Sequence, residues 1–479
     1  MKHLGKLLIT AVVVFVGPLS LGTALAATQD QQTESTSKTK PAGRGYPPYP
    51  DQDPNGDQDS TAPLQPDTRP LTGVQNPTLG SPELRHSYWV PGFEYSNIAT
   101  STALNQSTAS GWNSTSFVAG EVSLLQTWSH SQLSVNYSGG GYFSTDTSQG
   151  NGYFHVFGLV QTFEWKRWQL MLLDDSFYLP EAAFGFGVGI DISVPGVGSG
   201  LSGGLPGTQN NYQPNQSIFT SLGTRYSNSF TTQAVYALSP RASIDVAGSY
   251  GILRFLKAGN IDSNDTIFNV GYNYALSSRD TIGVLYRFTA FRYPGNQEAL
   301  NDHVVQAAYS HKITGRLAVQ LFGGPEISTS RALVGSSVSG SGGATLTYAS
   351  GSNNLSLIYT HRLSEGSGVQ FGSSTDQVQT ELDRELSRHW KGNLSFGYAR
   401  NGSLGNSGVS QNSGTFNSYY IGGGLSRALG RDSKFSLAYA TLIQTSNHAV
   451  CAAGTCSTSF TQHQIAAGFN WHTRPFVLR

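Results

Sequence analysis

Charged side chains are scarce in this chain of 479 residues, because Asp, Glu, Lys and Arg together make up only 12% of it. An ordinary soluble protein has roughly 25%. Acidic and basic residues number 29 each, so no overall field would attract nucleic acid. The composition therefore argues against an ordinary soluble domain and gives no support for a nucleic-acid partner.

Long apolar runs are missing after the N-terminus, and the mean hydropathy of -0.25 argues against helical membrane spans. The early run LLITAVVVFVGPLSLG follows Lys2 and Lys6 and precedes a small-residue site ending at Ala26. This arrangement predicts that residues 1–26 are a cleaved signal peptide. An uncleaved helical anchor is the alternative, but the run is short and is interrupted by glycine and proline. The exported chain would then either leave the membrane or cross one as a barrel.

Cysteine is nearly absent, and Cys451 and Cys456 lie close together in the sequence CAAGTC. In an oxidising compartment this pair predicts a local disulfide. A metal site is less favoured, since only His448 and His463 lie near and a structural site takes four ligands. We find no GxSxG, HExxH or phosphate-loop motif. We therefore expect no metal, no cofactor and no enzyme activity.

The clearest pattern lies between Thr266 and Tyr293, where apolar side chains recur at every second position on both sides of one turn. Such alternation indicates two strands joined as a hairpin. Each strand is about twice the usual length of 5 to 6 residues. That length suits a strand that crosses a bilayer at a tilt. The alternation assigns Tyr272 to the lipid-facing side and Leu285 to the lumen.

The same alternation continues from Ser87 to His472, and short connectors take turns with longer ones such as Ser328–Gly342. Outer-membrane barrels alternate tight periplasmic turns with longer outer loops in this way. We count about 18 strands, with about 16 as the nearest alternative because the first strand and Pro180–Arg225 are weakly patterned. The sequence therefore predicts an all-β fold, a transmembrane antiparallel up-and-down β-barrel, over residues 87–479. An even strand number places both ends of the barrel in the periplasm.

Residues 27–86 are rich in Pro, Ser, Gln, Thr and Asp and almost free of aliphatic side chains. Such a segment buries too little apolar area to offset the loss of chain entropy. We expect a disordered periplasmic segment. An extended docking motif at Tyr46–Pro50 is the alternative to a plain spacer. The segment is too short and too polar for the plug of a TonB-dependent transporter.

Five of the seven tryptophans lie beside a short connector or at the end of the last strand. Tryptophan prefers the interface between membrane and water. The sequence therefore predicts a periplasmic girdle of Trp128, Trp165, Trp168, Trp390 and Trp471.

By this pattern the chain resembles porin-like Gram-negative outer-membrane β-barrels. In the last strand, Gly468 and Trp471 resemble the C-terminal signal read by barrel-assembly machinery, although that signal ordinarily ends at a terminal aromatic and this chain continues to Arg479. The resemblance implies an outer-membrane location, with outer-membrane lipid and the barrel-assembly machinery as partners. It also implies passage of small polar solutes, and it is compatible with assembly into a homo-oligomer.

Charged residues on the polar alternation are candidates to line the pore. Such charges tune the selectivity of a channel. Those in the strand Thr375–Leu386 form an acidic ladder. Charges that merely pair inside a plugged lumen are the alternative. The candidates are Glu121, Asp245, Arg287, Lys312, Arg362, Glu381, Asp383, Glu385 and Lys434.

The longest connector, Pro180–Arg225, has an apolar, Gly-rich first half that is unusual for a solvated loop. Loops of this length are often functional or disordered. We expect it to fold into the barrel as a constriction; a surface lid is the alternative.

Three functions compete. The first is an outer-membrane channel for passive or weakly selective passage of small polar solutes. The second is a structural barrel with a blocked lumen that exports or anchors a surface polymer. The third, a minor alternative, is a hydrolase faintly similar to the omptin proteases, built from Asp174, Asp175, Asp302 and His303. Adjacent Asp174 and Asp175 must point to opposite faces, which is a serious departure from that family.

Overall fold

The computed structural model describes residues 70–74, 87–101, 111–147, 150–180, 212, 214–219, 224–256, 259–296, 298–330, 336–404, 414–446 and 459–478. Within these ranges no helix has the length and apolar character needed to cross a membrane. The described residues form 18 long strands and one strand of two residues. The strands are β1 (Tyr88–Ser101), β2 (Trp112–Thr127), β3 (Ser131–Ser144), β4 (Gly152–Glu164), β5 (Trp168–Leu179), β6 (Arg225–Ser239), β7 (Ala242–Phe255), β8 (Ser263–Ala275), β9 (Asp280–Arg292), β10 (Ala299–Thr314), β11 (Leu317–Ser330), β12 (Ser336–Ser350), β13 (Asn353–Ser364), β14 (Ser373–Ser387), β15 (Trp390–Ser403), β16 (Thr415–Ala428), β17 (Ser433–Ser446), β18 (Ser459–His472) and β19 (Phe476–Val477).

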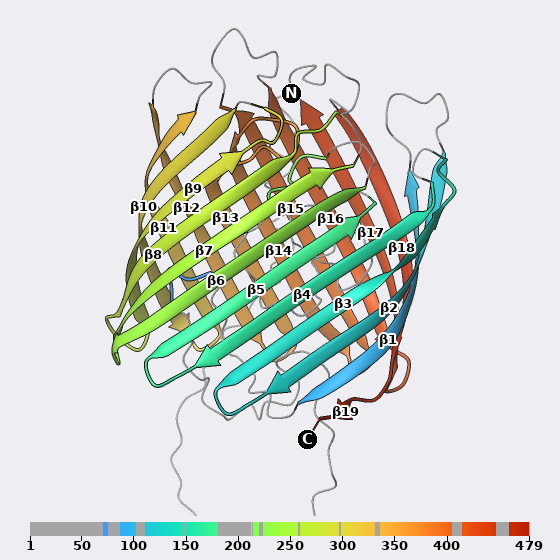
Figure 1. Ribbon diagram of the computed structural model, residues 1–479. Coiled ribbons are helices and arrows are strands. Elements are labelled where there is room, and N and C mark those ends of the chain that lie inside the picture. The colour runs from blue at the N-terminus through green and yellow to red at the C-terminus, as the bar shows by residue number, and fades with distance from the viewer. Residues whose placement is uncertain are drawn as a thin grey trace, which may run out of the picture. The chain divides into compact units, whose positions relative to one another are not determined.

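The sheet is a closed antiparallel barrel (Figure 1). Each long strand pairs with its neighbours in sequence, and β1 closes the ring against β18 with Gly92 opposite His472 and Thr100 opposite Gln464. Closure satisfies the backbone groups that an edge strand would leave unpaired. The prediction of about 18 strands is confirmed, and the alternative of about 16 is wrong.

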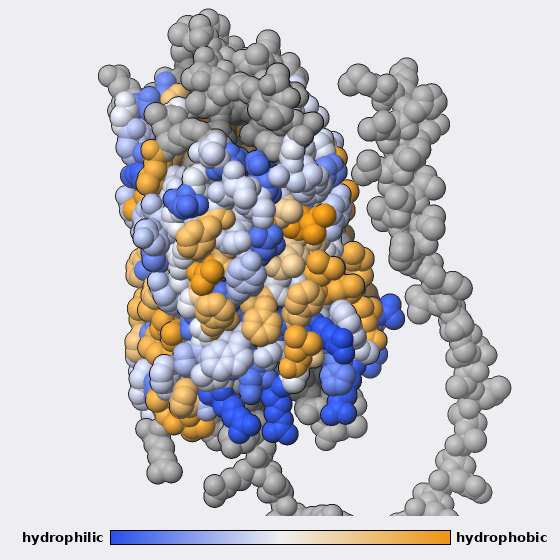
Figure 2. Space-filling model, turned by 90° about the vertical axis from the view of Figure 1, so that its right-hand side faces the viewer, coloured by the Kyte–Doolittle hydropathy of each residue, from blue (hydrophilic) through white to orange (hydrophobic). Residues whose placement is uncertain are grey.

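Alternate side chains point to opposite faces of the wall. On β8, Asp265, Ile267 and Asn269 are buried, whereas Thr266 and Phe268 are exposed between them. The exposed face carries many large apolar residues, and Figure 2 shows hydrophobic side chains gathered over the middle and lower wall. An apolar exterior around a polar interior reverses the pattern of a soluble barrel and defines a transmembrane β-barrel.

Short turns gather at one end of the barrel. The turns 128–130, 165–167, 240–241 and 388–389 each connect two long strands, and tight turns are periplasmic in outer-membrane barrels. All five tryptophans of the expected girdle lie at this end with between 38% and 54% of their surface exposed. Trp89 on β1 also lies there, and sequence reasoning missed it.

Two expectations need correction. The connector expected at Ser328–Gly342 is mostly strand, because β11 and β12 pair as far as Thr329 opposite Ser336. Side-chain alternation is hard to see in this serine- and glycine-rich stretch, yet its backbone groups complete the ladder as well as any other residue's. Residues 70–74 belong to the segment expected to be disordered and periplasmic, but they lie inside the barrel with buried side chains at Leu71 and Val74.

The chain end continues the wall beyond β18. Strand β19 pairs with the first residues of β1, and the ring of Phe476 stacks on Trp89 at 5.0 Å between centroids. Leu478 N–H donates to the Ser87 carbonyl. Figure 1 shows β19 at the end of the barrel that carries the short turns.

Candidate functional site

All nine predicted pore-lining residues occupy the alternation that faces the lumen. Asp245, Arg287 and Arg362 are buried in it. Glu121 accepts a 2.8 Å hydrogen bond from Asn470 Nδ2. The nine positions are spread around the wall, and the structure brings only some of them together.

The acidic ladder of β14 descends towards the turn end. Glu381 and Asp383 share the lumen face, and Glu385 lies further down, 3.4 Å from Lys391 Nζ in an exposed ion pair. Arg384 interrupts the apolar alternation, and it is exposed three residues before β14 ends at Ser387. That position near the interface makes an outward charge tolerable.

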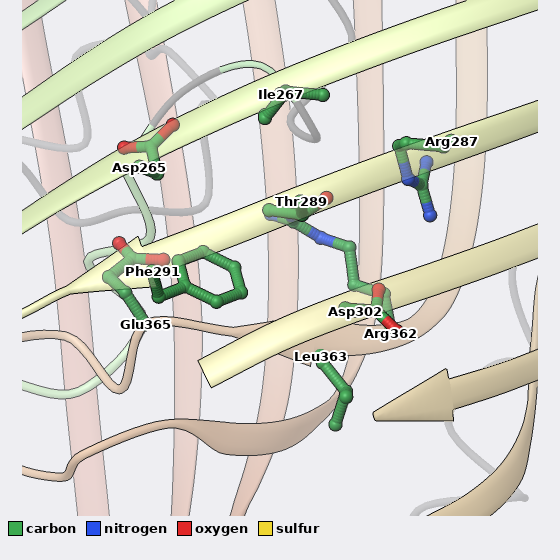
Figure 3. A pocket seen from close by; sticks show the side chains of 9 residues that line it. All are labelled: Asp265, Ile267, Arg287, Thr289, Phe291, Asp302, Arg362, Leu363 and Glu365. Carbon is green, nitrogen blue, oxygen red and sulfur yellow. The ribbon is translucent and has the colours of Figure 1, made fainter. Parts of the chain in front are cut away.

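A charged cavity forms where Arg287 and Arg362 meet acidic neighbours on the opposite side of the barrel from β1 (Figure 3). The free space between these side chains is small, with room for about one water molecule. Two guanidinium groups and three carboxyl groups line it together with apolar and hydroxyl side chains. The lining residues are Asp265, Ile267, Arg287, Thr289, Phe291, Asp302, Arg362, Leu363 and Glu365.

Glu326 on β11 extends the acidic side of this cavity. One of its carboxylate oxygens accepts from the Leu363 backbone N–H at 3.3 Å, and the other accepts from the Ser339 hydroxyl at 3.1 Å. Asp302 lies diagonally across from it, since Asp302 is opposite Ser328 in the β10–β11 register. Charges of both signs therefore sit within one buried region, where their mutual interaction is stronger than in water.

Glu365 follows the last residue of β13 and lies fully within the protein. Burial, and then the nearby Asp265 carboxylate, raise the pKa of Glu365 to about 8. Backbone donors, including the Asn215 N–H, oppose that shift. The Glu365 carbonyl accepts from the Tyr293 hydroxyl at 3.0 Å, which fixes the loop beside the cavity.

The described part of the long connector, residues 212 and 214–219, crosses the lumen. At one end the Tyr212 carbonyl accepts from the hydroxyls of Ser229 on β6 and Ser249 on β7. At the other end Phe219 N–H donates to Gln444 Oε1 of β17 at 2.8 Å. These residues lie inside the barrel, as expected for part of this connector, and a constriction of the channel by them stays a prediction.

Three cavity residues were missed by sequence reasoning. Asp265 shares the parity of Asn269, and extending the expected strand by one residue before Thr266 would have found it. Glu326 shares the parity of Gln320 and precedes the expected connector, so the alternation alone could have found it. Glu365 had no periodic signal, because it lies in a loop.

The residues of the hydrolase alternative are not assembled. Asp174 faces outward, where its carboxylate accepts from Asn228, while Asp175 is buried towards the lumen. Asp302 points into the lumen, and His303 points outward to the Tyr286 hydroxyl. Four strands, β6 to β9, lie between β5 and β10. Within the described ranges no group of three or more His, Cys, Asp or Glu side chains could hold a metal ion.

The fold and its lumen define an outer-membrane β-barrel. No protein-family model matches this sequence, and no curated protein matches it. Among solved structures the chain is similar to OccK2 (OpdF) of Pseudomonas aeruginosa, with 7% identity, 81% of this chain and 98% of that chain covered, and a TM-score of 0.41. It is also similar to OccAB3 of Acinetobacter baumannii, with 9% identity, 80% and 99% coverage, and a TM-score of 0.40. A third is OpdK of Pseudomonas aeruginosa with vanillate, with 8% identity, 80% and 99% coverage, and a TM-score of 0.40.

Proposed function

We propose that this barrel is an outer-membrane channel for small polar solutes, and that the charged cavity beside the constriction selects among them. The observation that carries the proposal is the cluster of Arg287, Arg362, Asp265, Asp302 and Glu365 around one cavity. A lumen that served only as a structural support would be expected to fill this region with packed apolar side chains. Charged side chains of both signs line it instead.

The chemistry of the lining favours solutes that carry a carboxylate, an amino group or both. Guanidinium groups bind carboxylates through paired N–H donors. Carboxylates on the opposing strands attract ammonium groups. Low-dielectric walls focus the field of such charges across the water between them. A small zwitterion would therefore find partners for both of its charges.

The decisive experiment is single-channel conductance of the purified full chain in planar bilayers, with reversal potentials measured in a KCl gradient. We expect discrete conductance steps. Replacing Arg287 and Arg362 together with Gln should shift selectivity towards cations, because two positive charges leave the lining. In swelling assays, glycine entry should be reduced more than glycerol entry.

Arg292→Gln is the matched control, since Arg292 is on the same strand but faces outward, where its guanidinium donates to Asn301 Oδ1 at 2.8 Å. The control should leave selectivity unchanged. Folded protein that never conducts would remove the channel proposal. It would favour the structural barrel with a blocked lumen. The two segments that lie inside the lumen, residues 70–74 and 214–219, also support that alternative.

Several finer expectations belong to the same proposal. Residues 1–26 act as the signal peptide, and outer-membrane lipid and the barrel-assembly machinery are the partners in biogenesis. The segment 27–86, apart from residues 70–74, is a periplasmic spacer. The cysteines at 451 and 456 fall outside the described residues, and the proposed disulfide between them remains a prediction. Assembly into a homo-oligomer stays open to measurement by mass in detergent.

A further inference from the structure

Residues 71–74 are held on the lumen wall by side chains from four strands. Thr72 N–H donates to Asn273 Oδ1 at 3.0 Å, and the Thr72 carbonyl accepts from Asn269 Nδ2 at 3.0 Å. The Thr72 hydroxyl donates to the buried Asp245 carboxylate. On either side, Val74 N–H donates to Gln233 Oε1 at 2.7 Å, and the Leu71 carbonyl accepts from Gln320 Nε2 at 3.3 Å. The wall thus satisfies backbone groups as a neighbouring strand would, but it does so with amide side chains.

The wall also matches the segment in shape. Val74 is fully buried in an apolar cluster with Leu173, Ala247 and Ile267. Gly271 lies beneath Thr72, and a Cβ atom built there would lie 2.6 Å from Thr72 Cβ. Any larger residue at 271 would therefore displace the segment or the wall. The site therefore fits this occupant. It offers matched polar partners, a pocket for the Val74 side chain and the space left by Gly271.

The position of the site relates it to the charged cavity. The lumen face of β8 presents Asp265, Ile267, Asn269, Gly271 and Asn273 in order towards the short-turn end. The first two line the cavity, while the last three contact or lie beneath Thr72. Residues 71–74 therefore sit between the cavity and the periplasmic mouth.

The occupant belongs to the same chain and binds far from where the barrel begins. Thr72 contacts β7 and β8, which lie six and seven strands from β1 in a ring of 18. Only residues 75–86 connect Val74 to Ser87, just before β1. Twelve residues reach up to about 43 Å, which is long enough for the connection. The segment is consequently tethered to the first strand while bound to the far wall.

We propose that the lumen faces of β6, β7, β8 and β11 form a peptide-binding site for residues 71–74, and that this segment gates passage between the charged cavity and the periplasm. The gate rests on the proposed channel function, but the binding site does not. Solute passes when the segment leaves the wall and is held back when it is bound. The site recognises a turn, which Gly73 N–H closes by donating to the Pro70 carbonyl at 3.1 Å. The turn presents a small hydroxyl side chain followed by glycine and a β-branched apolar residue.

The test is a reversible crosslink in the full chain. Thr72→Cys and Gly271→Cys are combined in a background with Cys451→Ser and Cys456→Ser. A disulfide needs Cβ atoms about 3.8 Å apart, whereas a Cβ at 271 would start 2.6 Å from that of Thr72, so the segment must lift slightly from the wall for the bridge to form. We expect the bridge to form in folded barrels from outer membranes. The oxidised barrel should remain closed, and reduction should raise the open fraction, whereas neither single-cysteine variant should respond to reductant.

A second variant guards against a folding failure of the first. Thr72→Val keeps the shape and removes the hydroxyl bond to Asp245. A hydrogen bond to a charged group is worth enough to raise the open fraction roughly tenfold to hundredfold when it is lost. Thr72→Ser, which retains the hydroxyl, should restore the closed state.

The outcomes separate the two proposals. No bridge in folded barrels, with Thr72→Val conducting as the wild type does, overturns the binding site. A bridge with equal conductance before and after reduction overturns the gate but leaves the channel. A bridge with no conductance in any form overturns the channel function and the gate together, and leaves the peptide-binding site supported.

Discussion

The hydroxyl group of Tyr286 on β9 lies 2.8 Å from Nδ1 of His303 on β10, on the outer face of the wall. The same pairing joins Tyr137 to His155 at 2.9 Å and Tyr439 to His463 at 2.8 Å. Each tyrosine stands six positions beyond the first residue of its strand, which is Ser131, Asp280 or Ser433. The three pairs therefore lie at one position along their strands, above the tryptophan girdle.

Removing one pair should lower barrel stability slightly. Tyr286→Phe removes the hydrogen bond between the tyrosine hydroxyl and His303 Nδ1, and we expect a loss of about 1 kcal/mol. Heat-induced loss of the compact band in detergent gels should begin at lower temperature. Tyr272→Phe is the matched control, because the Tyr272 hydroxyl makes no hydrogen bond to any described residue. Equal shifts for the two variants would contradict the role assigned to the pair.

The two faces of the wall should respond differently to a charge. Tyr272 faces outward with 43% of its surface exposed, and it is opposite Val284, whereas Leu285 points inward. An arginine facing lipid near the middle of the bilayer costs about 2 to 4 kcal/mol. Tyr272→Arg should reduce the yield of assembled barrel, and Leu285→Arg should be tolerated better. Similar losses at both positions would indicate a protein with two packed faces.

Conduction should change with pH through Glu365. Since the pKa of Glu365 is raised to about 8 by burial and by Asp265, the carboxyl is mostly neutral at pH 7. Raising the pH to about 9 adds a negative charge beside Arg362, Arg287 and Asp302, so cation preference should increase. Reversal potentials at pH 7 and 9 measure this. In Glu365→Gln the change should become smaller; an unchanged pH response there would assign it to another group.

The same group links pH to stability. The folded pKa of Glu365 lies above its ordinary value of 4.5, so the folded barrel holds a proton that the unfolded chain releases. Its contribution to stability is fully present below about pH 4.5 and declines as the pH rises towards about 8. Unfolding in denaturant at pH 5 and pH 8 should show a smaller decline for Glu365→Gln than for the wild type.

The acidic ladder makes a separate prediction. Replacing Glu381 with Gln and Asp383 with Asn removes two lumen-facing carboxylates, so selectivity should move towards anions. The change should shrink near 1 M salt, where the Debye length is about 3 Å. Glu385→Gln should have a smaller effect, because Glu385 is exposed beside Lys391. Conductance with unmoved selectivity would remove the ladder from the conducting path.

The wall could be predicted from sequence because its signal repeats at every second residue. Tyr272 and Leu285 were assigned to the correct faces by parity alone. The contents of the lumen could not be predicted in the same way. Thr72 and Phe219 make their contacts with Asp245, Asn273 and Gln444 across the bore. Such contacts join residues that are far apart in the chain and belong to no common side-chain alternation. No local sequence pattern therefore predicts them.

The pairing of Gly92 with His472 fixes the order in which this barrel can be completed. One edge of β1 pairs with β18, far away in the sequence, so it stays unpaired until β18 has been synthesised. A chain truncated before β18 would expose the edge of its first strand. Such an edge is a template for aggregation. Pairing of β18 with β1 is therefore the step that removes this exposed edge and completes the barrel.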